Sequence, residues 1–196
     1  MPRQLLFASG NHNKHLEIKA LLPVDLELVS PADLGWEEDI PETGKTLEEN
    51  ALQKAKFLWD RFGTAVFADD TGLEVEALQG APGVYSARYA GEQKNADDNM
   101  QKLLSELDNR RNRHAHFRTV IAYIDEQGNE HLFEGQVNGV ILREKRGDSG
   151  FGYDPVFLPD GQLRSFAEMT LEEKNALSHR ARALKAFMDF LQSEKS

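Results

Sequence analysis

The chain has 196 residues, 40% of them hydrophobic, and a formal net charge of −10. This length suits one domain that buries about 70% of the surface exposed by its unfolded chain. The sequence contains no cysteine, which excludes disulfides and thiolate metal sites, so any metal must be held by oxygen or imidazole ligands. The acidic balance excludes long-range attraction to nucleic acids and anionic membranes.

The N-terminal apolar run is too short for a signal peptide, and no run reaches the ~20 apolar residues of a membrane span. We therefore expect a cytoplasmic protein. An acidic protein that binds a polyanion needs deliberately placed cations or a divalent metal, so clusters of Lys, Arg and carboxylates are informative here.

The first half of the chain is predicted to alternate strands and helices. The spacing of apolar residues predicts strands over 4–9, 26–30, 64–70 and 73–78. It predicts helices over 12–22 and from Thr46 onward, the second with a capping box from Thr46 to Glu49. The expected buried stripe of this second helix consists of Ala51, Leu52, Ala55, Leu58 and Trp59.

The second half is predicted to contain a helix over 95–107 and a hairpin of two long strands, near 114–125 and 130–142. A long glycine-rich loop follows, then a short strand at "VFLP" and a capping box from Thr170 to Glu173. Helical spacing then runs to Leu191 with a break near Ser178. Early alternation and a late hairpin predict an α/β fold with a long mixed central sheet and flanking helices.

Two segments in the first half are candidates for chemistry. "SGNHNK" places Ser9, Gly10, Asn11 and Lys14 where a strand meets a helix, and backbone N–H groups with a helix dipole suit an anion there. A plain turn is the alternative. "FADDTG" places Asp69 and Asp70 at the end of an apolar strand, on opposite faces. The alternative is a solvated Asp-Thr-Gly turn.

Two further segments lie in the second half. "GDSGFGYDP" flanks Phe151 and Tyr153 with glycines, which lets the backbone approach a ligand and an aromatic face stack on a base. A flexible loop anchored by aromatic residues is the alternative. Lys174, His179 and Arg180 lie near the expected helix break, where cations are more often a solvated helix face.

Taken together, these segments resemble the inosine triphosphate pyrophosphatase family, the noncanonical purine nucleoside triphosphate pyrophosphatases. The resemblance covers essentially the whole chain. It rests on "SGNHNK", "PETGKTLEENALQKA", "ADDTGLEV", "GAPGVYSARYAG", "GFGYDPVF" and "LEEKNALSHRARAL", in this order. Thr71 stands where many members have serine, and His12 and Asn13 fall at positions that vary in the family.

The resemblance implies one domain over residues 1–196 without a linker, in which two lobes share one sheet around a deep substrate cleft. It also implies a homodimer that hydrolyses inosine, deoxyinosine and xanthosine triphosphates to the monophosphate and pyrophosphate with Mg²⁺, which keeps deaminated purines out of nucleic acid. It assigns Asp70 as proton acceptor, and Glu42 with Asp70 as metal ligands. The implied substrate-binding residues are Ser9, Gly10, Asn11, His12, Asn13, Lys14, Thr71, Phe151, Gly152, Tyr153, Asp154, Lys174, His179 and Arg180.

Two other functions stay open from the sequence. The same residues could bind a nucleotide without cleaving it, although Glu42, Asp69 and Asp70 would then repel a triphosphate unless a metal intervened. A related enzyme could act on altered pyrimidine triphosphates, but Phe151 and His179 favour a purine.

Overall fold

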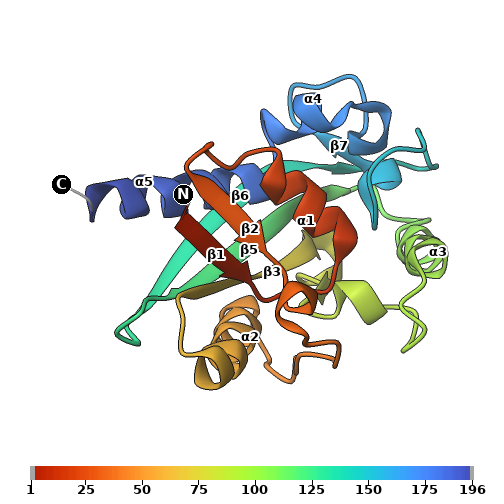
Figure 1. Ribbon diagram of the computed structural model, residues 1–196. Helices are drawn as coiled ribbons and strands as arrows, with labels where there is room; N and C mark the ends of the chain where they lie inside the picture. The colour runs from red at the N-terminus through yellow and green to blue at the C-terminus, as the bar shows by residue number, and fades with distance from the viewer. Residues whose placement is uncertain (1–2, 195–196) are drawn as a thin grey trace. The chain divides into compact units, whose positions relative to one another are not determined.

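A mixed β-sheet organises the structure, a computed structural model that describes residues 3–194. Within this range the strand order is β2-β1-β3-β5-β6-β7, with β4 paired to β3 (Figure 1). β1 runs parallel to β2 and β3, while β3–β4 and β6–β7 are antiparallel. The strands are β1 Arg3–Phe7, β2 Leu26–Val29, β3 Val66–Val75, β4 Pro82–Gly83, β5 His114–Ile124, β6 Glu130–Ile141 and β7 Phe157–Pro159.

Five α-helices flank this sheet in the described part of the chain: α1 His12–Lys19, α2 Leu47–Phe62, α3 Ala96–Glu106, α4 Leu171–Asn175 and α5 His179–Ser193. The mixed α/β class and the helix break before His179 are confirmed. None of these helices has the length and apolar character needed to cross a membrane.

The chain divides into two compact units according to its internal contacts. The substrate cleft expected from the sequence stays a prediction. The first unit comprises residues up to Asp70, 119–135 and from Arg180 on, and the second comprises 71–118 and 136–179.

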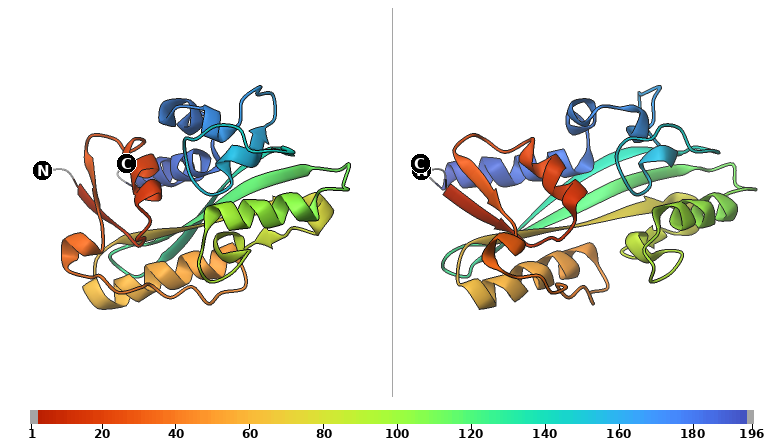
Figure 2. Two further views of the ribbon diagram at one scale, coloured as in Figure 1. Left: turned by 90° about the vertical axis from the view of Figure 1, so that its right-hand side faces the viewer. Right: turned by 45° about the vertical axis from the view of Figure 1, so that its right-hand side comes forward.

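In the first unit, three helices cover the two faces of the sheet. α5 packs with α1 on one face, where Leu5, Phe67 and Phe187 belong to one buried apolar cluster. α2 lies on the other face (Figure 2). Because strand side chains alternate between faces, the neighbours Leu6 and Val66 point toward α2. This layering buries both faces of β1 and β3.

The ends of α1 and α2 are fixed by side-chain caps. Asn11 caps α1, which ends at Lys19 rather than at the expected residue 22. Thr46 caps α2 by accepting a hydrogen bond from the Glu49 N–H, as predicted. The Glu49 carboxylate, however, accepts from the Lys45 N–H instead of completing the expected box with Thr46. The buried residues of α2 are Leu47, Asn50, Ala51, Lys54, Ala55 and Leu58. The polar Asn50 and Lys54 are therefore buried, whereas Leu52 and Trp59, which were predicted to be buried, are only half-buried.

The second unit has its own apolar core. Leu73, Phe117 and Phe157 come from three strands of the sheet, and Leu103 comes from α3, which runs alongside (Figure 2). The capping box from Thr170 to Glu173 is present at the start of α4, as predicted.

One prediction about the strands is wrong. Residues 66–75 form a single ten-residue strand, β3, where two strands around a turn were expected. The Thr71-Gly72 pair stays extended because Gly72 packs against the β4 backbone and the Leu73 N–H bonds to the Ser86 hydroxyl at 2.9 Å. A solvated Asp-Thr-Gly turn is likewise excluded, because Asp69 and Asp70 are both buried.

Gly72 provides a test of this close packing. A Cβ at this position would lie 2.6 Å from the Gly83 carbonyl oxygen, and a backbone atom cannot move aside as a flexible side chain can. We expect Gly72→Ala to lower the free energy of unfolding by about 1–3 kcal/mol in urea titrations. Gly10→Ala is the control, because a Cβ there meets nothing within 4 Å. Equal stability of the two variants would contradict the account.

Candidate active site

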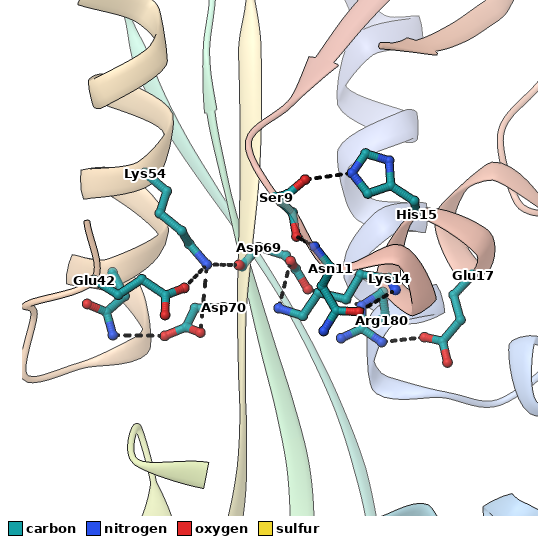
Figure 3. Close-up of polar contacts among 11 residues, drawn as sticks. Ser9, Asn11, Lys14, His15, Glu17, Glu42, Lys54, Asp69, Asp70 and Arg180 are labelled. Atoms are coloured by element: carbon teal, nitrogen blue, oxygen red, sulfur yellow. Dashed lines mark hydrogen bonds and ion pairs between the residues drawn. The ribbon is translucent and has the colours of Figure 1, made fainter. Parts of the chain in front are cut away.

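Asp69 lies at the centre of a buried group of charges in the first unit. It is 0% exposed. Its Oδ1 lies 3.0 Å from the Lys14 ammonium and its Oδ2 lies 3.0 Å from Arg180 Nε (Figure 3). Arg180 is itself 1% exposed and also contacts the buried carboxylate of Glu17. Asp69 therefore holds one cation from α1 and one from α5.

Asp70 points to the opposite side of β3, as the strand alternation predicts. Its Oδ2 accepts a hydrogen bond from Asn50 Nδ2 at 3.1 Å, and its Oδ1 lies 3.9 Å from the Lys54 ammonium. Lys54 also donates to Glu42 Oε1 at 2.5 Å and to the Asp69 carbonyl oxygen at 2.6 Å (Figure 3). Glu42 and Asp70 thus converge on one ammonium group.

We call these seven charged residues the ionic cluster: Lys14, Glu17, Glu42, Lys54, Asp69, Asp70 and Arg180.

The two aspartates of this cluster differ in their electrostatics. Burial raises the pKa of Asp69, but the Lys14 and Arg180 charges outweigh burial and hold that pKa well below its usual range. Burial also raises the pKa of Asp70, and Lys54 with Lys14 offsets this only in part, so that pKa stays above its usual value. Asp69 is therefore a stabilised anion, whereas Asp70 is the better proton acceptor of the two.

Exposure separates the cluster into buried and accessible groups. The side chains of Asp69, Arg180 and Glu17 are at most 4% exposed, while those of Lys14, Asp70 and Glu42 are 13%, 12% and 33% exposed. The accessible groups are therefore one lysine and two carboxylates. Among the charges of the cluster, these are the most open to a ligand.

The accessible carboxylates fit a magnesium ion. Mg²⁺ typically binds one or two protein carboxylates and completes its shell with water and phosphate oxygens. Glu42 and Asp70 contact the same Lys54 ammonium, at 2.5 and 3.9 Å, so the two carboxylates lie near one another beside an existing cation. No group of three or more His, Cys, Asp or Glu side chains suited to a metal occurs within residues 3–194. Two carboxylates therefore suit a metal that takes its remaining ligands from water or from a substrate.

The "SGNHNK" segment forms the start of α1. Asn11 Oδ1 accepts from the Lys14 N–H at 3.2 Å, and Ser9 Oγ accepts from the Asn11 N–H at 3.1 Å. Gly10, Asn11, His12 and Asn13 are exposed, and Ser9 is buried. The side chains of Ser9 and Asn11 therefore fix this turn, and residues 10–13 lie at the surface beside Lys14.

A second group of predicted residues lies in the second unit. Lys174 and Asp154 form a buried ion pair at 2.7 Å. The Lys174 ammonium lies 4.8 Å from the centre of the half-buried Phe151 ring, and Asp154 accepts from the Phe151 N–H at 3.0 Å. These contacts fix the loop at residue 151. We call Phe151, Asp154 and Lys174 the aromatic loop cluster.

The remaining predicted residues of the second unit differ in position. Thr71 and Gly152 are half-buried. Tyr153 belongs to the core, and its hydroxyl donates to the Ser86 carbonyl oxygen at 2.7 Å. His179 is 3% exposed, and its ring stacks on Phe117 with centroids 4.6 Å apart.

Sequence reasoning missed three residues of the first unit. Asn50 and Lys54 lie four positions apart on the stripe of α2 that carries Ala51 and Ala55, so their burial was signalled by helical spacing. Glu17 precedes the buried Ile18 on α1 and had no such signal. Buried polar side chains need partners, and the ionic cluster supplies them.

Comparison with known proteins identifies the family. The model of the Ham1 family matches residues 5–190. The chain belongs to the Ham1 family. A Flavobacterium psychrophilum relative is 52% identical over 97% of this chain and 100% of its own, and a Porphyromonas gingivalis relative is 55% identical over 96% and 97%. Both relatives are named dITP/XTP pyrophosphatase.

Similar solved structures share the fold. The Ham1 protein of Staphylococcus aureus superposes with a TM-score of 0.89 at 39% identity, over 98% of this chain and 100% of that one. A protein from Mycobacterium abscessus, described as nucleoside-triphosphatase / dITP/XTP pyrophosphatase, has a TM-score of 0.76 at 43% identity, over 94% and 98%.

The contrast between the two aspartates predicts opposite effects on stability at pH 7. Asp69→Asn leaves Lys14 and Arg180 without their shared anion, so we expect the free energy of unfolding to fall by about 3–5 kcal/mol. Asp70→Asn removes a carboxylate that burial disfavours in its ionised form, so stability should be unchanged or higher. Urea titrations of both variants without divalent metal provide the measurement.

The pH dependence of this stability difference tests whether the ionised Asp69 carboxylate causes it. Because the folded pKa of Asp69 is depressed, its contribution is complete above its unfolded value of about 3.9 and is lost as pH falls through the folded pKa. The stability difference between wild type and Asp69→Asn should therefore shrink only in strongly acidic solution. A similar loss in both variants at pH 7 would refute the contrast.

Proposed function

We propose that this chain hydrolyses inosine, deoxyinosine and xanthosine triphosphates to the monophosphate and pyrophosphate in a Mg²⁺-dependent reaction. Such an enzyme removes deaminated purines from the nucleotide pool. The names of relatives about half identical over nearly the whole chain support the substrate class. The convergence of Glu42 and Asp70 on the Lys54 ammonium, which brings two partly accessible carboxylates together, is the observation that supports the chemistry.

The accessible charges of the ionic cluster suit a metal–triphosphate. A triphosphate carries close to four negative charges, which a protein of net charge −10 can hold only with local counter-charge. Lys14 supplies a point charge for phosphate, beside the backbone N–H groups at the start of α1. When bound at Glu42 and Asp70, Mg²⁺ supplies charge neutralisation for phosphate oxygens and the leaving group.

Asp70 is the proposed proton acceptor. Water attacks the α-phosphorus, the bond from that phosphorus to the α–β bridging oxygen breaks, and pyrophosphate leaves with the bonding electron pair. The Asp70 carboxylate takes the proton of the attacking water. Asp69 stays ionised and holds Lys14 in place.

The aromatic loop cluster is proposed to bind the purine. Phe151 offers a half-buried ring for stacking, and the Lys174–Asp154 pair fixes its loop. A donor aimed at C6 would donate to the carbonyl of inosine and xanthosine and would face the amino group of adenine as a second donor. The proposed donor is His179, Arg180 or a backbone N–H. The other proposed substrate-binding residues are Ser9, Gly10, Asn11, His12, Asn13, Thr71, Gly152 and Tyr153. A cytoplasmic homodimer is part of the same proposal.

The products distinguish this reaction from its alternatives. With deoxyinosine triphosphate and Mg²⁺ in ¹⁸O-labelled water, we expect monophosphate and pyrophosphate, with the label in the monophosphate. Mass spectrometry of both products measures this. Orthophosphate as the primary product, or label in pyrophosphate, would contradict attack at the α-phosphorus. Binding without turnover would favour a sensor, and a preference for altered pyrimidines would favour the related enzyme.

Asp70→Asn tests the proton acceptor. We expect kcat to fall by at least about 100-fold, because the variant loses the base and a metal-binding charge. Initial rates of pyrophosphate release give the comparison, with Asp160→Asn as control because Asp160 is exposed and lies outside both clusters. Near-normal turnover in Asp70→Asn would place the base elsewhere.

A further inference from the structure

Asn50 connects the two carboxylates that face the Lys54 ammonium. The residue is 1% exposed, and its side chain bonds in two directions. Oδ1 accepts from the Gly44 N–H at 2.7 Å, and Nδ2 donates to Asp70 Oδ2 at 3.1 Å. Gly44 lies two residues after Glu42 in the loop before α2. One amide therefore links the loop that carries Glu42 to the strand that carries Asp70.

The orientation of this amide is fixed by its partners. Gly44 offers an N–H, and the ionised Asp70 only accepts, so a flipped amide would face a donor with a donor and an acceptor with an acceptor. The approach of Gly44 to α2 is close: a Cβ there would lie 2.7 Å from Asn50 Oδ1, 2.7 Å from Glu49 Cβ and 2.9 Å from the Asn50 backbone nitrogen. Glycine at residue 44 is thus required by the close contact of this loop with the start of α2, the Asn50 side chain included.

Gln53 offers an internal comparison one turn along the same helix. Its Oε1 accepts from the Thr43 N–H at 2.8 Å, and its Nε2 donates to the Thr43 hydroxyl at 2.9 Å. Gln53 therefore also tethers this loop to α2 by two hydrogen bonds, which are exposed to solvent. Both Gln53 hydrogen bonds end on Thr43 of the loop, whereas the Asn50 side chain also donates a hydrogen bond to Asp70.

We propose that Asn50 is a positioning residue that sets Glu42 relative to Asp70 so that both carboxylates meet one divalent cation. The inference rests on the proposed metal role of these carboxylates and adds the residue that fixes their relative position. Residues that bond to metal-binding carboxylates orient them, and their loss typically weakens metal binding by about 10–100-fold. A loop tether without contact to Asp70 has no such effect.

Three variants separate these roles. Asn50→Ala removes both bonds, Gly44→Ala pushes the loop away from an intact Asn50, and Gln53→Ala removes the matched tether. We expect Mn²⁺ binding to the substrate-free protein, measured by electron paramagnetic resonance, to weaken at least about 10-fold in the first two variants and hardly in the third. The Mg²⁺ concentration for half-maximal turnover should rise equally, while KM at saturating Mg²⁺ stays within about 2-fold of wild type.

The outcomes distinguish this inference from the function on which it rests. If wild type binds Mn²⁺ but Asn50→Ala and Gly44→Ala behave like Gln53→Ala, Asn50 is not a positioning residue and the proposed function stands. If wild type binds no Mn²⁺ and needs no divalent metal, both proposals fail. Should Asn50→Ala not fold, as judged by circular dichroism, Gly44→Ala decides because it leaves the Asn50 side chain in place.

Discussion

The complete burial of the Asp69 carboxylate is the constraint on which the site of the first unit depends. A buried charge is tolerated only when partners compensate its lost hydration, and Lys14 and Arg180 do so at 3.0 Å each. Arg180 in turn requires Glu17. The start of α1 and the start of α5 are therefore tied to β3 by ionic contacts as well as by apolar packing.

Strand geometry places two consecutive residues, Asp69 and Asp70, in different environments. Asp69 and Asp70 point to opposite faces of β3, so one carboxylate is enclosed by cations while the other keeps 12% of its side chain exposed. Asp70, the less deeply buried of the two, has the raised pKa in the metal-free protein. In the proposed function, the stability provided by Asp69 allows the fold to hold Asp70 in a state that is costly for folding and useful for proton transfer.

Strong periodicity made much of the fold predictable, and long-range contacts account for what was missed. α3 and the β5–β6 hairpin follow from local spacing. The single strand β3 did not, because Asp-Thr-Gly has turn chemistry and only distant residues such as Ser86 keep it extended. Asn50 had a visible signal in its helical position, but its partners at Gly44 and Asp70 depend on how the preceding loop folds.

Locating the metal directly tests the central claim that Glu42 and Asp70 form one cation site. Fe²⁺ bound in place of Mg²⁺, with ascorbate and peroxide, cleaves the backbone next to its ligands, and mass spectrometry maps the cuts. We expect cleavage in two separate segments, around Glu42 and around Asp70, both suppressed by excess Mg²⁺. Cuts confined to other segments, or to only one of these two, would contradict it.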